Sequence, residues 1–204
     1  MSKTINESKH QEQVLKIIGK ARSLFAEKGY AETSMADIAE ASELQKATLY
    51  HYFDSKEALL FGILECHAHE EDVKEHFERV FPGASLEERF YQVAKFHLGE
   101  MDKKDNFDFM KILLVEATTG SDRMKEYFQA YMRKQLDAFV KGVIAPAMEG
   151  RMNEIEMNRL GFQFSAALMY YSWQSRLLGR FEDKVGPEDD YIRALAKIFG
   201  KQGV

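Results

Sequence analysis

The sequence predicts an all-α protein of about nine helices, in which a three-helix N-terminal helix-turn-helix domain precedes a larger helical domain. Apolar residues recur three and four positions apart along most of the chain, and no stretch alternates with the two-residue period of a strand. Ser, Asn, Gly and Pro stand where these periodic stretches begin or end, as helix caps and breakers do. We place the two domains at residues 1–56 and 57–204.

Composition is typical of a globular protein that does not enter a membrane. The 204 residues are 45% hydrophobic and 30% charged, and no apolar run approaches the ~20 residues that a membrane-spanning helix requires. The first thirteen residues lack the apolar core and cleavage site of a signal peptide. The single cysteine, Cys66, excludes an intramolecular disulfide and fits a reducing compartment. We therefore expect a cytoplasmic protein.

Residues 33–56 hold the densest set of helix signals in the chain. Ser34 and Asp37 have the spacing of a capping box, which starts a short helix. That helix breaks near Glu43, and Gln45 opens a second one whose Leu49 and Phe53, four residues apart, point inward. Two short helices joined by a tight corner predict a helix-turn-helix.

The outward face of the second short helix carries side chains that donate hydrogen bonds. Gln and Lys can read base edges, whereas Thr, Tyr and His commonly hold phosphates, so this mixture suits a helix laid in a DNA groove. Asp54 and Glu57 predict another capping box, which puts Lys56 in the first turn of the next helix, where a phosphate could be held. The expected DNA-binding residues are Thr33, Ser34, Gln45, Lys46, Thr48, Tyr50, His51 and Lys56.

This region resembles the DNA-binding domain of the tetracycline-repressor (TetR) family of bacterial regulators, from about Ile17 to Leu60. The residues that carry the resemblance are Phe25, Gly29, Tyr30, Thr33, Asp37, Ile38, Ala39, Thr48, Leu49, Tyr50, Phe53, Ser55, Lys56 and Glu57. Two positions depart from the family pattern, because Glu43 stands where Gly is usual and Gln45 where a small residue is usual. Glu43 would strain a corner that needs a positive φ, and Gln45 puts the usual operator in doubt.

The net charge of −5 is distributed unevenly. Residues 1–56 contain eight Lys and Arg against eight Asp and Glu, and the remainder contains 20 against 25. A neutral DNA-binding domain has weak non-specific affinity, so binding should depend on two such domains acting together.

Seven further helix predictions complete the chain. Pro146 falls inside one of them and should kink it, because proline removes a backbone hydrogen bond and pushes against the carbonyl four residues earlier, at Gly142. The expected helices lie at about 13–28, 54–81, 85–103, 107–119, 121–148, 154–181 and 188–200.

The second domain is expected to bind an effector. Aromatic residues and methionines interspersed with a few polar groups could line an adaptable cavity for a small apolar or amphipathic molecule, although ordinary core packing accounts for many of them. The expected effector-binding residues are Phe109, Met110, Leu113, Glu116, Tyr127, Tyr131, Phe164, Met169, Trp173 and Arg176.

The helix at 154–181 is apolar nearly all round, so it has to be covered on all sides. Its own domain can cover one side and a second copy the other, which predicts a homodimer; a fully buried central helix in a monomer is the alternative. The expected dimerisation residues are Leu160, Ala167, Tyr171, Leu178, Tyr191, Leu195 and Phe199.

These expectations describe a homodimeric repressor that binds palindromic operator DNA and is released by an effector. A metal or redox sensor is an alternative on the same scaffold, because Cys66, His69, His76 and His97 could bind metal, although His76 lies about 10 Å along the helix from His69. A helical enzyme is a further alternative, but no catalytic or nucleotide-binding motif supports it. We expect no cofactor and no bound metal.

Overall fold

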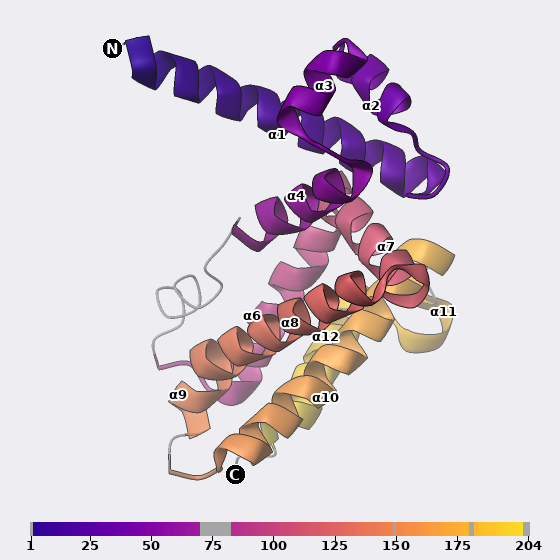
Figure 1. Cartoon of the computed structure of the whole chain (residues 1–204). Coiled ribbons are helices and arrows are strands. Elements are labelled where there is room, and N and C mark those ends of the chain that lie inside the picture. The colour runs from indigo at the N-terminus through magenta and orange to yellow at the C-terminus, as the bar shows by residue number, and fades with distance from the viewer. Residues whose placement is uncertain (1, 70–82, 149, 180–181, 202–204) are drawn as a thin grey trace. The chain divides into compact units, whose positions relative to one another are not determined.

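The computed structural model describes residues 2–69, 83–148, 150–179 and 182–201, and the regular structure of these residues is entirely helical, which confirms the predicted fold class. None of the described helices combines the length and apolarity needed to cross a bilayer. The helices, labelled in Figure 1, are α1 (Ser2–Lys28), α2 (Met35–Ala41), α3 (Lys46–Tyr52), α4 (Lys56–His69), α6 (Leu86–Met101), α7 (Lys104–Thr119), α8 (Asp122–Phe139), η1 (Val140–Ile144), α9 (Ala145–Met148), α10 (Glu154–Trp173), η2 (Gln174–Leu178), α11 (Glu182–Val185) and α12 (Glu188–Gly200).

The helices form two compact units whose borders differ from the expected domains. The first unit contains residues 1–70 together with 104–125, and the second contains 71–103 and 126–204. The expected border at residue 56 would cut through α4, whose Leu59, Leu60 and Ile63 are buried. Burial of these side chains with those of α1 and α7 makes the whole of α4 as described, and all of α7, part of the first unit.

In the first unit, one face of α1 packs against α2, α4 and α7. Spacings of three and four residues place Ile17, Ala21 and Phe25 on this face, and all three are buried. The other helices contribute Met35, Ile38, Ala39, Leu49, Leu59, Leu60, Ile63, Leu64, Phe109, Ile112 and Leu113 to the buried set. In Figure 1, α2 and α3 lie beside the middle of α1.

Helix α1 is longer than the sequence predicted. It begins at Ser2, whereas residues before Gln13 were expected to fray. Two contacts attach its first half to the rest of the unit: the rings of His10 and Tyr52 stack with centroids 5.0 Å apart, and Lys16 pairs with Glu43 at 2.6 Å. Both partners come from later in the chain, so local sequence signals do not reveal them.

The second unit is built around stacked phenylalanines. The ring centroid of Phe164 lies 4.3 Å from that of Phe90, and Phe139 and Phe199 pack on the same pair. Helices α6 and α12 approach very closely, because a Cβ added to Gly200 would lie 2.5 Å from the Cα of Glu87. Only glycine permits this approach.

The hydrogen-bonding pattern of the helix changes just before Pro146. The π-helical segment η1 precedes it, and the amide of Ala145 donates to the carbonyl of Val140, five residues back. Proline has no backbone N–H to donate, and the wider π-helical turn before Pro146 accommodates this missing donor. A second π-helical segment, η2, ends α10 before Gly179, which has φ = 99°.

Arg176 in η2 joins three parts of the second unit. Its guanidinium pairs with Glu188 at 2.7 Å and with Asp102 at 3.1 Å, and it donates to the carbonyl of Leu98. The side chain is 9% exposed. These bonds fasten the end of α10 to the C-terminal end of α6 and to the start of α12.

Beside this cluster, Nε2 of His97 is buried without a hydrogen-bond partner among the described residues. Burial, helped by the positive charge of Arg176, lowers the pKa of His97 to about 4. The imidazole is therefore neutral in the folded protein at pH 7.

This histidine makes folding stability depend on pH. Between its ordinary pKa of about 6.5 and its folded pKa of about 4, the unfolded chain binds a proton that the folded chain does not. The free energy of unfolding should therefore fall as the pH falls through this range, by up to about 3 kcal/mol. Chemical denaturation of His97→Gln between pH 7 and pH 4.5 should show a flatter profile than the unmodified protein. The exposed His51→Gln serves as the control, and equal profiles for both variants would contradict this role of His97.

Candidate nucleic-acid interface

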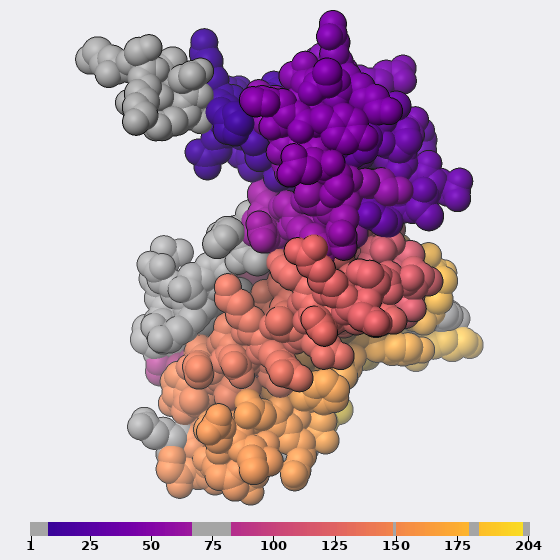
Figure 2. Space-filling model, in the orientation of Figure 1, coloured from indigo at the N-terminus to yellow at the C-terminus, as the bar shows by residue number. Residues whose placement is uncertain are grey.

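The outward face of α3 presents a row of hydrogen-bonding side chains to solvent. Helix α3 is anchored by Leu49, which is fully buried. Gln45 precedes the first turn and makes no capping hydrogen bond, so its amide is not used by the helix. The side chains that the structure exposes here are Gln45, Lys46, Thr48, Tyr50 and His51. The segment that carries them has the purple part of the colour scale in Figure 2.

Helix α2 begins with the predicted capping box. The Ser34 hydroxyl accepts from the amide of Asp37 at 3.2 Å, and Oδ2 of Asp37 accepts from the Ser34 amide at 2.7 Å. The hydrogen bonds from Ser34 lower the pKa of Asp37. A shallow hollow opens beside this helix start, and Ser34, Lys46, Tyr50 and Lys56 line it. The fold thus gathers donors from α2, α3 and α4 around one hollow.

Thr33, expected to hold a phosphate, is turned inward. Its side chain is buried, and its hydroxyl donates to the carbonyl of Gly29 at 2.8 Å, with the carbonyl of Leu24 at 3.4 Å. These carbonyls lie at the end of α1, where helix acceptors lack partners. Thr33 therefore closes α1, and its side chain is not on the exposed surface.

Lys56 also serves the fold of this unit. Its ammonium donates to the carbonyls of Tyr30 at 2.6 Å and Ala31 at 3.1 Å, and lies 4.4 Å from the centroid of the Tyr30 ring. Three N–H donors belong to an ammonium, so two are already used. Lys56 thus fastens the first turn of α4 to the loop between α1 and α2.

The cap of α4 differs from the expected one. The hydroxyl of Ser55, rather than Asp54, accepts from the amide of Ala58 at 3.0 Å, and the helix starts at Lys56. Its expected end near Phe81 lies outside the described residues.

The corner between α2 and α3 has the strained conformation that the sequence suggested. Glu43 has φ = 61°, and it is the non-glycine residue with positive φ in the described chain. The left-handed region costs such a residue of order 1 kcal/mol. The Lys16–Glu43 pair offsets little of this cost, because the Glu43 side chain is 80% exposed.

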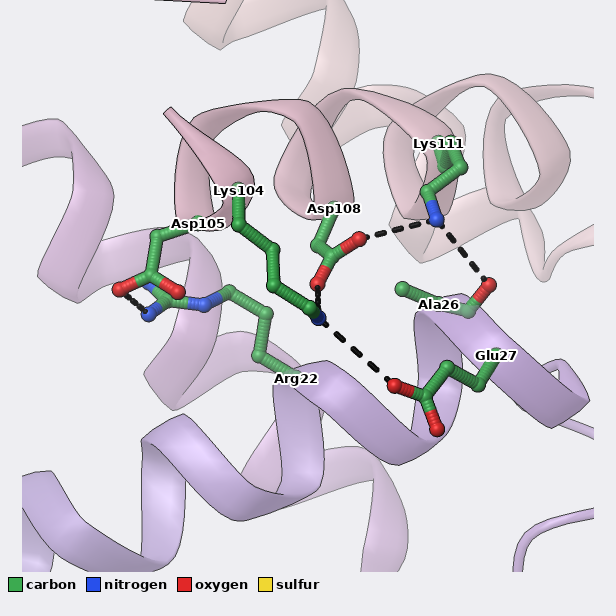
Figure 3. Close-up of polar contacts among 7 residues, drawn as sticks. All are labelled: Arg22, Ala26, Glu27, Lys104, Asp105, Asp108 and Lys111. Carbon is green, nitrogen blue, oxygen red and sulfur yellow. Dashed lines mark hydrogen bonds and ion pairs between the residues drawn. The ribbon is translucent and has the colours of Figure 1, made fainter. Parts of the chain in front are cut away.

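A charged network joins α7 to α1 (Figure 3). At its centre, the buried carboxylate of Asp108 pairs with Lys104 at 2.5 Å and with Lys111 at 2.9 Å. Burial alone would raise the pKa of Asp108, but the hydrogen bonds from both lysines outweigh it, and the pKa is lowered. Asp108 is therefore a carboxylate whose charge is balanced locally.

The same lysines reach α1. Lys111 lies 3.5 Å from the carbonyl of Ala26, and Lys104 lies 3.7 Å from Glu27. Arg22, whose side chain is almost buried, pairs with Asp105 at the start of α7. Sequence reasoning missed this network, although the Lys104–Asp108–Lys111 spacing on one helix was a signal that could have indicated it.

The structure does not bring the expected effector-binding residues into one compact unit. Phe109, Met110, Leu113 and Glu116 belong to the first unit and are buried there. The other members lie in the second unit: Tyr127, Tyr131, Phe164, Met169, Trp173 and Arg176.

Two of these residues have structural roles. Phe164 is fully buried among the stacked phenylalanines, and Arg176 is taken up by its ion pairs. Tyr131, Met169 and Trp173 are half-buried, and burial raises the pKa of Tyr131 to about 12.

Most expected dimerisation residues pack inside the second unit. Leu160, Tyr171 and Leu195 are buried, and they belong to its core with Ala167, Tyr191 and Phe199 packed against them. Their burial follows from contacts within the chain, because α10 has to cover the core formed by α6, η1 and α12. Leu178 differs, with 76% of it exposed.

Apart from Leu178, the exposed apolar side chains of this unit are not among the expected dimerisation residues. Large apolar side chains that the structure leaves exposed on α10, η2 and α12 are Ile155, Phe162, Tyr170, Leu177, Leu178 and Ile198. The i, i+4 and i+8 spacing of Phe162, Ala166 and Tyr170 places these three on one face of α10, and all are exposed.

The structure describes no metal site. Within the ranges it covers, no group of three or more His, Cys, Asp and Glu residues could hold an ion. Cys66 is half-buried, and His76 lies outside the described residues.

Comparisons with known proteins agree with this geometry. A family model described as "Bacterial regulatory proteins, tetR family" matches residues 17–63. The negative transcriptional regulator IcaR of the biofilm operon icaADBC in Staphylococcus aureus is 45% identical over 51 residues. This segment is 25% of the present chain and spans only 27% of that relative.

Solved structures extend the likeness to nearly the whole chain. A TetR-family transcriptional regulator from Bordetella parapertussis is 25% identical with a TM-score of 0.61, over 91% of this chain and 93% of the other. A regulator from Saccharomonospora viridis, solved in complex with choline, shares the fold with 19% identity and a TM-score of 0.68, over 94% and 96%. The helix-turn-helix segment thus matches the TetR family of bacterial regulatory proteins in sequence, and the all-helical fold of the chain is the one found in TetR-family regulators.

Proposed function

We propose that this protein is a transcriptional repressor that reads operator DNA with the outward face of α3. The observation that carries the proposal is the row of exposed donors on a helix anchored by one buried leucine, Leu49. A helix with donors on one face and an apolar anchor on the other fits a DNA major groove. The likeness to IcaR, a negative regulator, within this same segment supports repression.

The roles of the donors follow from their positions and chemistry. Gln45, at the start of α3, carries an amide that can pair with a base edge, and Lys46 can reach guanine acceptors. Thr48, Tyr50 and His51 have groups that suit phosphates. Ser34 and Lys56 line the hollow beside them, and the third proton of Lys56 is the group it can offer to a phosphate.

The proposed repressor acts as a two-fold dimer. The first 56 residues have no net positive charge, so two DNA-binding units have to act together for useful affinity. The exposed apolar residues of α10, η2 and α12 form the surface that we assign to the partner copy. Two-fold symmetry would then require a palindromic operator.

An effector would release the operator. Support comes from the related fold that holds choline in its crystal structure, and from Tyr131, Met169 and Trp173, which are half-buried on helices of the second unit. Aromatic and thioether side chains suit an amphipathic molecule of adaptable shape.

Single substitutions in α3 should distinguish residues that contact bases from residues that contact phosphates. Gln45→Ala should cost about 1–3 kcal/mol at particular base pairs and relax preference there, because it removes a base contact. Tyr50→Phe should weaken all sequences alike, because it removes only a hydroxyl. Selection from randomised duplex DNA, followed by titration of selected and unselected sequences, measures both effects. Lys141→Ala, at an exposed position of the second unit outside the proposed dimer surface, is the control. The same loss of discrimination in both α3 variants would refute the division of roles.

The proposed dimer surface can be tested by charge. Phe162→Glu and Ile198→Glu should give monomers at micromolar concentration, because a carboxylate cannot be buried there without a partner. Sedimentation analysis measures the mass, and Val115→Glu places the same charge on an exposed apolar site of the first unit as a control. If the unmodified protein is a monomer at micromolar concentration, the proposed dimer is wrong.

Effector binding can be followed through Trp173, because the chain contains one tryptophan. A compound that releases DNA should change Trp173 emission, and operator DNA should weaken its binding by the same factor, about 150-fold for a coupling of ~3 kcal/mol. Choline, longer quaternary amines and neutral apolar compounds form the first panel. Trp173→Phe should impair release while leaving operator affinity without ligand unchanged. If no compound alters both emission and operator affinity, the half-buried residues are only core.

A further inference from the structure

A second hollow of the first unit lies between the N-terminal half of α1 and the end of α3. Lys9, His10, Gln13 and Tyr52 contribute polar groups to its lining, and Val14 and Leu44 contribute apolar ones. This hollow is separate from the one beside α2, with which it shares no residue. None of the DNA-binding residues expected from the sequence lines it.

The position of this hollow follows from the extension of α1. His10, Gln13, Val14 and Ile17 are three and four residues apart, so they continue the face of α1 that packs on the rest of the unit. His10 stacks on Tyr52 with an angle of 25° between the rings, which holds the extension against the last turn of α3. His51, the neighbouring residue of that turn, is exposed beside it. Figure 1 shows the N-terminal half of α1 running past α3.

Gln13, one of the lining residues, carries a hydrogen-bond donor that no described residue satisfies. Nε2 of Gln13 is buried and has no partner among the described residues. A buried amide without an acceptor is rare in folded proteins, and a ligand oxygen would complete it. Lys9, another lining residue, has an ammonium group that can donate up to three hydrogen bonds. Glu12, also exposed on α1, does not line the hollow.

We infer that this hollow binds a phosphate of the DNA backbone that flanks the bases facing α3. The inference rests on the proposed function and adds a contact to it. A phosphate oxygen supplies the acceptor that Gln13 lacks and the negative charge that Lys9 attracts. Since Tyr52 and His51 end the helix that faces the groove, a strand that passes α3 reaches Lys9 and Gln13 next. The extension of α1 thus lengthens the DNA segment that each half of the dimer covers.

Two substitutions separate the charge from the amide. Lys9→Ala should lower the slope of log affinity against log salt by about 0.9 for each DNA-binding unit, hence about two for the dimer, because one phosphate per unit is no longer neutralised. Gln13→Leu should weaken binding about tenfold for each unit with an unchanged salt slope, because a neutral donor is lost. It should not destabilise the free protein, since it removes an unsatisfied group. Lys141→Ala, which removes one positive charge from the second unit, should change neither quantity.

The source of the phosphate is tested in the same assay. A selected operator with an uncharged methylphosphonate at one flanking position should bind the unmodified protein as weakly as Lys9→Ala binds the unmodified operator. When the variant and the modified operator are combined, the losses of affinity should not add. Wild-type affinity and slope for both variants would overturn the inference while leaving the proposed function intact. Competition by inorganic phosphate at constant ionic strength, with no effect of any methylphosphonate, would show a free-anion site and also overturn it. Failure of the unmodified protein to select any DNA would remove the proposed function itself, and the inference with it.

Discussion

Burial of one face of α1 is the interaction on which the DNA-binding unit depends. Ile17 and Ala21 have no exposed surface, and the helices around them come from parts of the chain separated by up to about a hundred residues. Removing this much apolar surface from water contributes more than any single polar contact in the unit. The polar contacts then fix orientation: Thr33 closes the end of α1, Lys56 holds the following loop, and Arg22 of α1 pairs with Asp105 of α7.

This arrangement explains why residues expected to touch DNA divide into two groups. Side chains on the outward face of α3 make few contacts within the protein, so their donors remain for a ligand. Thr33 and Lys56 instead satisfy backbone carbonyls at the joints between helices. Replacing either would disturb the unit as well as any phosphate contact, because a carbonyl would lose its donor. Loss of DNA binding in such variants therefore would not identify a direct contact.

The second unit shows the same distinction between packing and recognition. Most residues expected as dimer contacts because they are apolar belong to the core of the unit or pack against it from α10 and α12. Phe162 and Tyr170 on the outer face of α10 remain exposed. A helix that is apolar nearly all round gives no sign of which side meets its own domain. Contacts with α6, η1 and α12 determine which side of α10 faces the core of its own unit, and the opposite side stays available for another protein surface.

From the sequence alone, the all-helical fold, the helix-turn-helix, the Ser34–Asp37 capping box and the outward donors of α3 could be predicted. These features depend on residues within about one or two helical turns of each other, where spacing determines geometry. The tertiary structure decided what long-range contacts determine. In the structure, α1 begins at Ser2 and its extension stacks on Tyr52, and α7 belongs to the first unit. Thr33 and Lys56 donate hydrogen bonds within the fold, and Arg176 forms ion pairs. Each of these outcomes depends on a partner distant in the chain, and no local pattern specifies which partner a buried or charged side chain will meet.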